Sequence, residues 1–148
     1  RGKGEMKDWR NEMQVLPIGK GKKLCDGDDI AVLSIGPIGN EVIKAIEMVK
    51  EEGVSIAHYD MIYLKPLDEE LLHEIGQKYN RIITVENGVI KGGFGSAVLE
   101  FMADNGYTPH VKRIGVPDAF IEHGSIPELY QLCGMDAESI AKQLKKEN

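Results

Sequence analysis

Four stretches of the chain have the length and the apolar residues expected of β-strands, and the first of them is nearly continuous in apolar residues. They are "DIAVLSIG" at residues 29–36, "VSIAHYDMIYL" at 54–64, "RIITVE" at 81–86 and "HVKRIGV" at 110–116. The first run shows little apolar-polar alternation, which is expected of a strand that is covered on both faces. The runs therefore predict strands of a sheet that carries helices on both sides.

Between these runs the apolar positions recur with the spacing of an α-helix, three and four residues apart. Each such stripe predicts a helix that packs one face against the sheet. The expected stripes are Val42, Ala45, Ile46 and Val49 within residues 40–52; Leu71, Leu72 and Ile75 after residue 68; and Val98, Phe101 and Met102 within residues 96–105.

Residues that start and stop helices support this division. Gly53 is suited to end the first helix, and Asp68 to cap the second. Two more helices close the chain: Ser125 begins one as part of a capping box with Glu128, and Asp136 begins the other. Alternating strands and helices predict an α/β fold, a three-layer domain with a mainly parallel, five-stranded sheet and right-handed crossovers.

The first residues of the chain differ from the rest. Residues 1–28 are rich in glycine and charge and contain the single tryptophan, Trp9. We expect residues 1–28 to be a lead-in with one short strand near residues 13–18, and residues 29–148 to form the domain. Because the sequence starts at Arg1 rather than at methionine, we also expect it to be a processed product or a piece of a longer protein.

Composition narrows the class of protein. A net charge of −6 and a pI near 5.2 argue against nucleic acid as a partner, since phosphate binding needs a basic surface. We find neither an apolar run of membrane-spanning length nor a signal-peptide pattern, which predicts no membrane partner. Cys25 and Cys133 form no Cys-x-x-Cys pair, as is typical of a reduced, cytoplasmic protein.

One loop has the arrangement of a phosphate-binding site. The stretch "VENGVIKGGFGSAV" at residues 85–98 places glycines between an expected strand and an expected helix. A Walker loop needs a lysine directly after its last glycine, and Lys91 lies before the glycines instead. A dinucleotide fingerprint needs a third glycine where Val98 stands. We therefore interpret these glycines as a structural turn, with nucleotide binding by an independent α/β domain as the alternative.

The four histidines show no pattern that indicates a metal site or a catalytic site. None of the four lies at metal-ligand spacing from another, so we predict no metal site. His123 follows Asp118 and Glu122, and an acid–base role or a pairing with Cys133 is conceivable, but a hydrogen-bonded loop histidine is the ordinary outcome. Local reasoning thus predicts no catalytic residue and no self-sufficient active site.

Several motifs taken together resemble a known family. "KPLD" at residues 65–68, "TVENGVIKGGFGSAV" at 84–98 and "IGVPDAFIEHGS" at 114–125 occur in the order found in the C-terminal domain of the transketolase-like, thiamine-diphosphate-dependent enzymes. "LPIGKG" at residues 16–21 and "IGVPDAFIEHG" are typical of the branch that produces 1-deoxy-D-xylulose 5-phosphate. The resemblance extends over the whole chain.

The resemblance implies a function for the parent enzyme. Such an enzyme condenses pyruvate with glyceraldehyde 3-phosphate, releases CO2 and feeds isoprenoid, thiamine and pyridoxal synthesis. The resemblance also implies that the two preceding domains hold thiamine diphosphate and Mg²⁺ and that this domain binds no cofactor. This domain would be inactive alone, would pack on those two domains and would support a homodimer, with Glu86 and the glycine loop in an architectural role.

One site role carries over by resemblance. "RGKG" at the start is similar to the end of a family segment whose arginine helps to hold the substrate phosphate, so Arg1 is expected to bind the phosphate of glyceraldehyde 3-phosphate in the parent. The corresponding domain of transketolase or of a 2-oxo-acid dehydrogenase beta subunit is the alternative family reading. An isolated domain is also expected to form a non-native dimer through apolar surface left uncovered.

Overall fold

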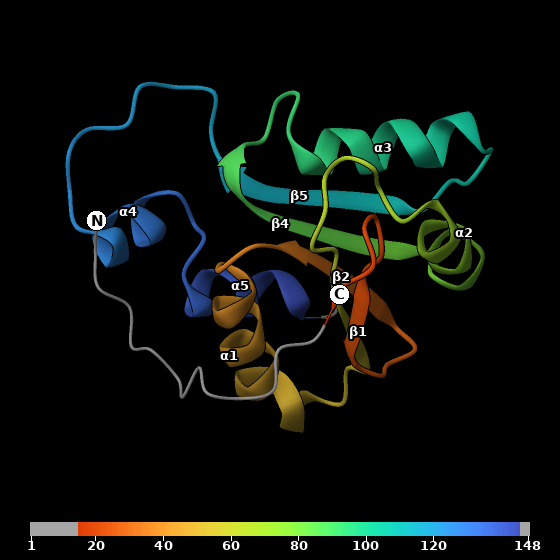
Figure 1. Cartoon of the computed structure of the whole chain (residues 1–148). Coiled ribbons are helices and arrows are strands. Elements are labelled where there is room, and N and C mark those ends of the chain that lie inside the picture. The colour runs from red at the N-terminus through yellow and green to blue at the C-terminus, as the bar shows by residue number, and fades with distance from the viewer. Residues whose placement is uncertain (1–14, 146–148) are drawn as a thin grey trace.

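The computed structural model describes residues 15–145 and contains a five-stranded sheet (Figure 1). The strands lie in the order β1-β3-β2-β4-β5. The pairs β3–β2, β2–β4 and β4–β5 are parallel, and the edge strand β1 is antiparallel to β3. The predicted α/β class with a mainly parallel, five-stranded sheet is confirmed. The strands are β1 Lys22–Cys25, β2 Ile30–Ile35, β3 Ile56–Asp60, β4 Arg81–Val89 and β5 His110–Val116.

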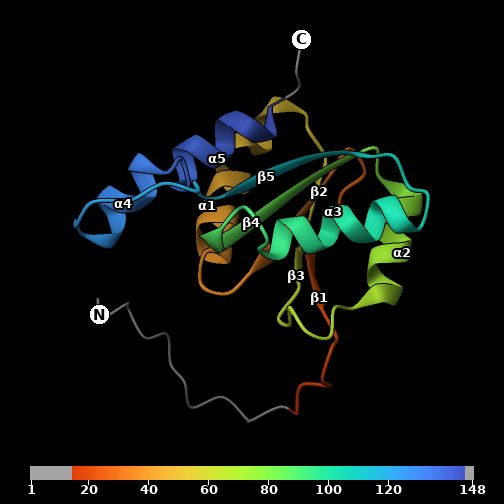
Figure 2. The same ribbon diagram turned by 90° about the horizontal axis from the view of Figure 1, so that it is seen from above.

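Helices cover both faces of the sheet, which gives three layers (Figure 2). The core on one face joins β2, β4 and β5 to α1 (Gly39–Val49) and α5 (Ala137–Leu144), with α4 (Ile126–Leu132) beside them. The core on the other face joins β2 and β3 to α2 (Glu69–Lys78) and α3 (Phe94–Asp104). Ala31, Val32 and Leu33 of β2 are all fully buried, as a central strand covered on both sides requires.

The first strand lies elsewhere than predicted. Residues 15–18, the described part of the segment expected to contain a short strand, are not a strand, and β1 begins only at Lys22. Three of its four residues are exposed, so β1 carries no apolar pattern, and it is held by its backbone pairing with β3. β1 precedes residue 29, the expected start of the domain; that boundary itself stays a prediction.

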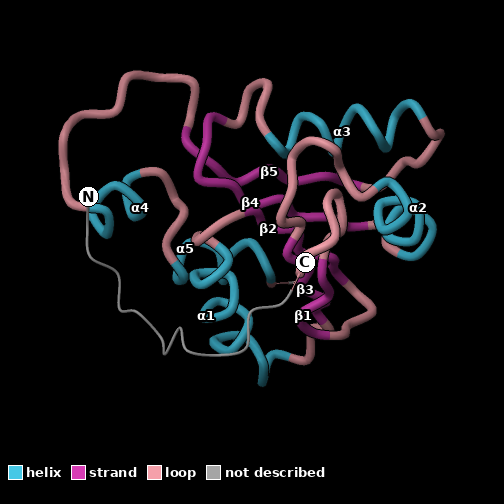
Figure 3. Tube along the Cα trace, in the orientation of Figure 1, coloured by secondary structure: helices cyan, strands magenta, loops and turns pink. Residues whose placement is uncertain are grey.

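Most of the other expected elements are present with shifted ends (Figure 3). The second expected strand is confined to β3, and β4 continues to Val89, three residues beyond its predicted end. The first helix is divided into α1 and a 3-10 turn, η1 (Lys50–Glu52), and α3 begins at Phe94. These shifts lie at chain reversals, where apolar periodicity carries least information.

The predicted helix signals are confirmed. Gly53 adopts φ +72° after η1, and the Asp68 side chain accepts a hydrogen bond from the Leu71 N–H at the start of α2. Ser125 and Glu128 form the capping box of α4, and Asp136 caps α5 through the Ser139 N–H. Short polar side chains at these positions therefore determine where the helices begin.

Candidate functional site

The carboxyl edge of the parallel strands is where a ligand site is expected. The chain passes from β2 to β3 on one side and then returns to place β4 on the other side of β2. In open α/β sheets, ligands bind outside the carboxyl ends of the strands at such a reversal of strand order. The glycine loop between β4 and α3 begins at this position, which makes it the candidate site.

A buried carboxylate occupies the start of α3. Glu86, at 4% exposure, accepts hydrogen bonds from the N–H groups of Phe94 and Gly95, each at 2.8 Å. The next two N–H groups, of Ser96 and Ala97, donate to the Gly93 carbonyl. Glu86 thus supplies the negative charge that a helix N-terminus favours, in the place where a bound phosphate would otherwise lie.

The glycines of this loop are required by close approach and by backbone angle. A Cβ on Gly93 would lie 2.2 Å from Glu86 Oε2 and 2.4 Å from the Val89 carbonyl. Gly92 adopts φ +71°, a left-handed conformation that favours glycine. Arg113 of β5 holds the loop from beneath, because its guanidinium donates to the Ile90 carbonyl at 2.7 Å and to Ser96 Oγ at 2.9 Å. The loop is therefore a turn whose backbone is held by hydrogen bonds and close contacts within the chain itself.

A shallow hollow of about 380 Å³ lies beside the loop. Its walls are the corner at residues 64–67 with Glu69 on one side, and Gly92, Gly93 and Ser96 with Glu100 on the other. The charged side chains around it, Lys65, Glu69 and Glu100, are exposed. A small-molecule site generally has buried polar groups that orient the ligand, and the walls of this hollow provide none.

A buried serine–histidine pair lies near the end of β2. Ser34 Oγ and His58 Nε2 are 2.8 Å apart, and each residue is 1% exposed. Burial lowers the pKa of His58 to about 4, although the charge of Asp60 acts in the opposite direction. The imidazole is therefore neutral at physiological pH, and its burial leaves no room for a substrate.

The other residues considered from the sequence do not come together. His123 is exposed, whereas the half-buried Cys133 packs against the core as the residue that ends α4. Asp118 instead pairs with Lys91 at 3.1 Å. Arg1 lies outside the described residues, so its expected role stays a prediction.

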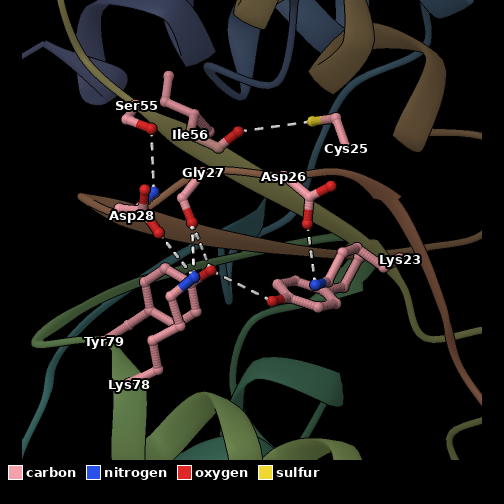
Figure 4. Close-up of polar contacts among 10 residues, drawn as sticks. Lys23, Cys25, Asp26, Gly27, Asp28, Ser55, Ile56, Lys78 and Tyr79 are labelled. Atoms are coloured by element: carbon pink, nitrogen blue, oxygen red, sulfur yellow. Dashed lines mark hydrogen bonds and ion pairs between the residues drawn. The ribbon is translucent and has the colours of Figure 1, made fainter.

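A second polar cluster lies at the opposite, amino end of the sheet (Figure 4). The Gly27 carbonyl accepts hydrogen bonds from the Tyr79 hydroxyl at 2.7 Å and from Lys78 Nζ at 3.1 Å. Lys78 also pairs with Asp28 at 2.7 Å and thereby lowers the pKa of that carboxyl. A Cβ on Gly27 would lie 2.1 Å from the Ile56 carbonyl carbon, so the cluster serves tight packing of the β1–β2 turn.

Sequence reasoning found the glycine loop, and the family resemblance gave Glu86 an architectural role, but neither identified the contact of Glu86 with the start of α3 or the contact of Arg113 with the loop. Glu86 lies eight residues before the N–H group of Phe94, and Arg113 lies 23 residues after the carbonyl that it binds. An acidic residue at the end of a strand before a glycine loop was the available signal for Glu86.

Within residues 15–145 no group of His, Cys, Asp and Glu side chains is arranged to hold a metal ion. In the same part of the chain, every helix is too short or too polar to cross a membrane.

Comparisons with known proteins identify the fold and its relatives. The model of the family "Transketolase, C-terminal domain" matches residues 19–140. A protein of Parabacteroides distasonis described as 1-deoxy-D-xylulose-5-phosphate synthase is 99% identical over 148 residues, and one of Bacteroides fragilis with the same description is 58% identical over 147 residues. The chain spans 23% of the length of these relatives.

Solved structures agree with this assignment. One described as "Split gene transketolase, inactive beta4 tetramer" superposes with a TM-score of 0.78 at 31% identity, over 88% of this chain and 45% of that chain. The transketolase of Campylobacter jejuni superposes with a TM-score of 0.62 at 13% identity, over 84% of this chain and 18% of that chain, and supports the fold alone. The resemblance predicted from the sequence motifs is confirmed: the chain belongs to the transketolase C-terminal domain family.

Proposed function

We propose that this chain acts as the C-terminal domain of a 1-deoxy-D-xylulose-5-phosphate synthase. The parent enzyme would condense pyruvate with glyceraldehyde 3-phosphate, release CO2 and serve isoprenoid, thiamine and pyridoxal synthesis in the cytoplasm. The observation that carries this proposal is the 99% identity, across the full length of this chain, to a protein of that description.

Within the parent, the domain would have a structural role. Thiamine diphosphate and Mg²⁺ would be bound by the two preceding domains, on which this domain would pack, and it would support the homodimer. The glycine loop supports this assignment, because Glu86 accepts the hydrogen bonds of the helix N–H groups to which a diphosphate would otherwise bind. The related split-gene structure, whose description calls its beta assembly inactive, supports the proposal that this chain is inactive alone.

Arg1 is the one residue to which we assign contact with substrate. In the parent it would pair with the phosphate of glyceraldehyde 3-phosphate, a role suited to the planar, permanently charged guanidinium. Arg1→Met in the full-length enzyme should raise the KM for glyceraldehyde 3-phosphate at least tenfold and change the KM for pyruvate little. Equal effects on both constants would contradict the assignment.

The function is tested by comparing this chain with the full-length enzyme that carries it. The full-length protein should form 1-deoxy-D-xylulose 5-phosphate, whereas this chain alone should neither form it nor bind thiamine diphosphate and Mg²⁺ in isothermal titration. Micromolar binding by this chain would refute its structural role. If the full-length protein instead transferred two-carbon units between sugar phosphates, the transketolase alternative would replace the synthase.

A further inference from the structure

Two motifs that the proposed function leaves unexplained meet in the structure. Residues 17–21, "PIGKG", precede β1, and the corner "KPLD" at residues 65–68 leads into α2. We propose that residues 17–21, called the strap below, are latched onto this corner by the Asp68 carboxylate and thereby fix the point at which preceding polypeptide joins the sheet.

The glycines of the strap allow its backbone to lie directly on the corner. Gly19 is buried with φ +74°, and a Cβ there would lie 2.7 Å from Pro66 Cγ. A Cβ on Gly21 would lie 2.8 Å from a Leu71 methyl group and 3.2 Å from the Asp60 carbonyl. Side chains at these two positions would push the strap away from the corner, so the pattern of glycines is explained by contact rather than by looseness.

The Asp68 carboxylate binds both the strap and the first turn of α2. Asp68 is 6% exposed; its Oδ1 accepts from the Leu71 N–H at 3.2 Å and so caps α2, and its Oδ2 accepts from the Gly21 N–H at 2.9 Å and so holds the strap. Burial raises the pKa of Asp68, but these hydrogen bonds and Lys20 outweigh it, and the pKa lies below its ordinary value. The carboxylate is therefore charged whenever the strap is in place at neutral pH.

A lysine of the strap adds an outer contact. Lys20 Nζ lies 3.4 Å from Asp68 Oδ1 and also pairs with Glu70 of α2. Its side chain is 46% exposed, so this contact is weaker than the backbone hydrogen bond to Asp68. The latch thus depends mainly on Asp68 and on the close approach of Gly19 to Pro66.

Limited trypsin digestion of this chain tests the latch, because cleavage after Lys20 requires the strap to leave the corner. Asp68→Ser retains a hydroxyl that caps α2 but is too short to hold Gly21 as well. Gly19→Ala introduces a Cβ that overlaps Pro66 and leaves Asp68 unchanged. Gly53→Ala is the matched control, since Gly53 has a similar φ of +72° and no atom within 4 Å of its Cβ position.

The proposal expects Asp68→Ser to be cleaved after Lys20 about tenfold faster than the native chain, the factor that loss of one charge-assisted hydrogen bond gives. Gly19→Ala should also be cleaved faster there, because its Cβ would overlap Pro66. Cleavage after Lys78, read by mass spectrometry in the same digest, should change less than about twofold, and Gly53→Ala should match the native rate after Lys20. The proposal is overturned if neither Asp68→Ser nor Gly19→Ala accelerates cleavage after Lys20 selectively, or if Gly53→Ala does so equally.

Discussion

The buried histidine makes the stability of this chain depend on pH in a defined window. Replacing His58 by glutamine removes the only titrating group of the Ser34–His58 pair and leaves an amide that can still hydrogen-bond Ser34. In the native chain, His58 has a pKa of about 4 when folded and an ordinary value of 6.5 when unfolded. The unfolded chain therefore binds more protons below pH 6.5, and the folded state loses stability as the pH falls toward 4.

The magnitude follows from these two values. The free energy of unfolding should fall by about 2 kcal/mol between pH 8 and pH 5 and by about 3 kcal/mol at pH 4. At pH 5 this corresponds to a decrease in Tm of about 6 °C for a domain of this size. The carboxyls of Asp68 and Asp136, whose pKa values are lowered, add their own losses near and below pH 4, so the interval from pH 6.5 to 5 isolates His58.

The assay is urea unfolding of the native chain, His58→Gln and His110→Gln at pH 8, 7, 6 and 5. His58→Gln should flatten the dependence between pH 6.5 and 5, whereas His110→Gln, at an exposed position of β5, should retain the native dependence. In NMR spectra of the native chain, the His58 ring protons should show no more than about a tenth of their full titration shift between pH 7 and 5. Equal pH dependence in the native chain and His58→Gln would refute the reasoning.

Three further outcomes are expected. Gly93→Ala should lower the free energy of unfolding by about 1–3 kcal/mol, because its Cβ would overlap Glu86 Oε2. Gly36→Ala is the control: its Cβ meets no neighbour, so it should cost only the left-handed backbone strain of about 1 kcal/mol. Equal losses of stability in urea unfolding would contradict this expectation. Arg81→Met should lower stability by about 1 kcal/mol and speed hydrogen exchange in α5, since the guanidinium binds the carbonyls of Gln143 and Lys145 at its end; unchanged exchange in α5 would count against it. Sedimentation of the isolated chain should show a concentration-dependent dimer, and a strict monomer at high concentration would argue against uncovered apolar surface.

The sequence was sufficient to predict the elements that bury their side chains. β2 is apolar at nearly every position because helices cover both its faces, and the helix caps at Asp68 and Asp136 are local signals. β1 could not be predicted because an exposed edge strand needs only backbone pairing, and its lysines show no alternation. Its position is determined by β3, which lies far along the chain.

The candidate site shows the same limit. Residues 85–98 match neither phosphate-binding motif, which indicated a structural loop. Only the fold brings Glu86 to the first turn of α3 and Arg113 to the loop carbonyl that it binds. The Ser34–His58 contact joins two strands across 24 residues, and the contact of Gly21 with Asp68 spans 47. Such contacts depend on how distant elements pack against one another, which no local pattern in this sequence determines.

The carboxyl edge of the sheet bears on the proposed structural role of a fold that elsewhere binds ligands. The N–H groups that begin α1, from Gly39 to Val42, donate to carbonyls of the preceding turn, between Gly36 and Ile38. Asp68 caps α2, and Glu86 fills the start of α3. At all three termini, groups that could attract an anion are bound to the chain itself, so a phosphate would have to displace a buried carboxylate or a backbone contact at a net cost. The edge is thereby committed to holding loops in fixed positions, which is the property that packing against other domains requires.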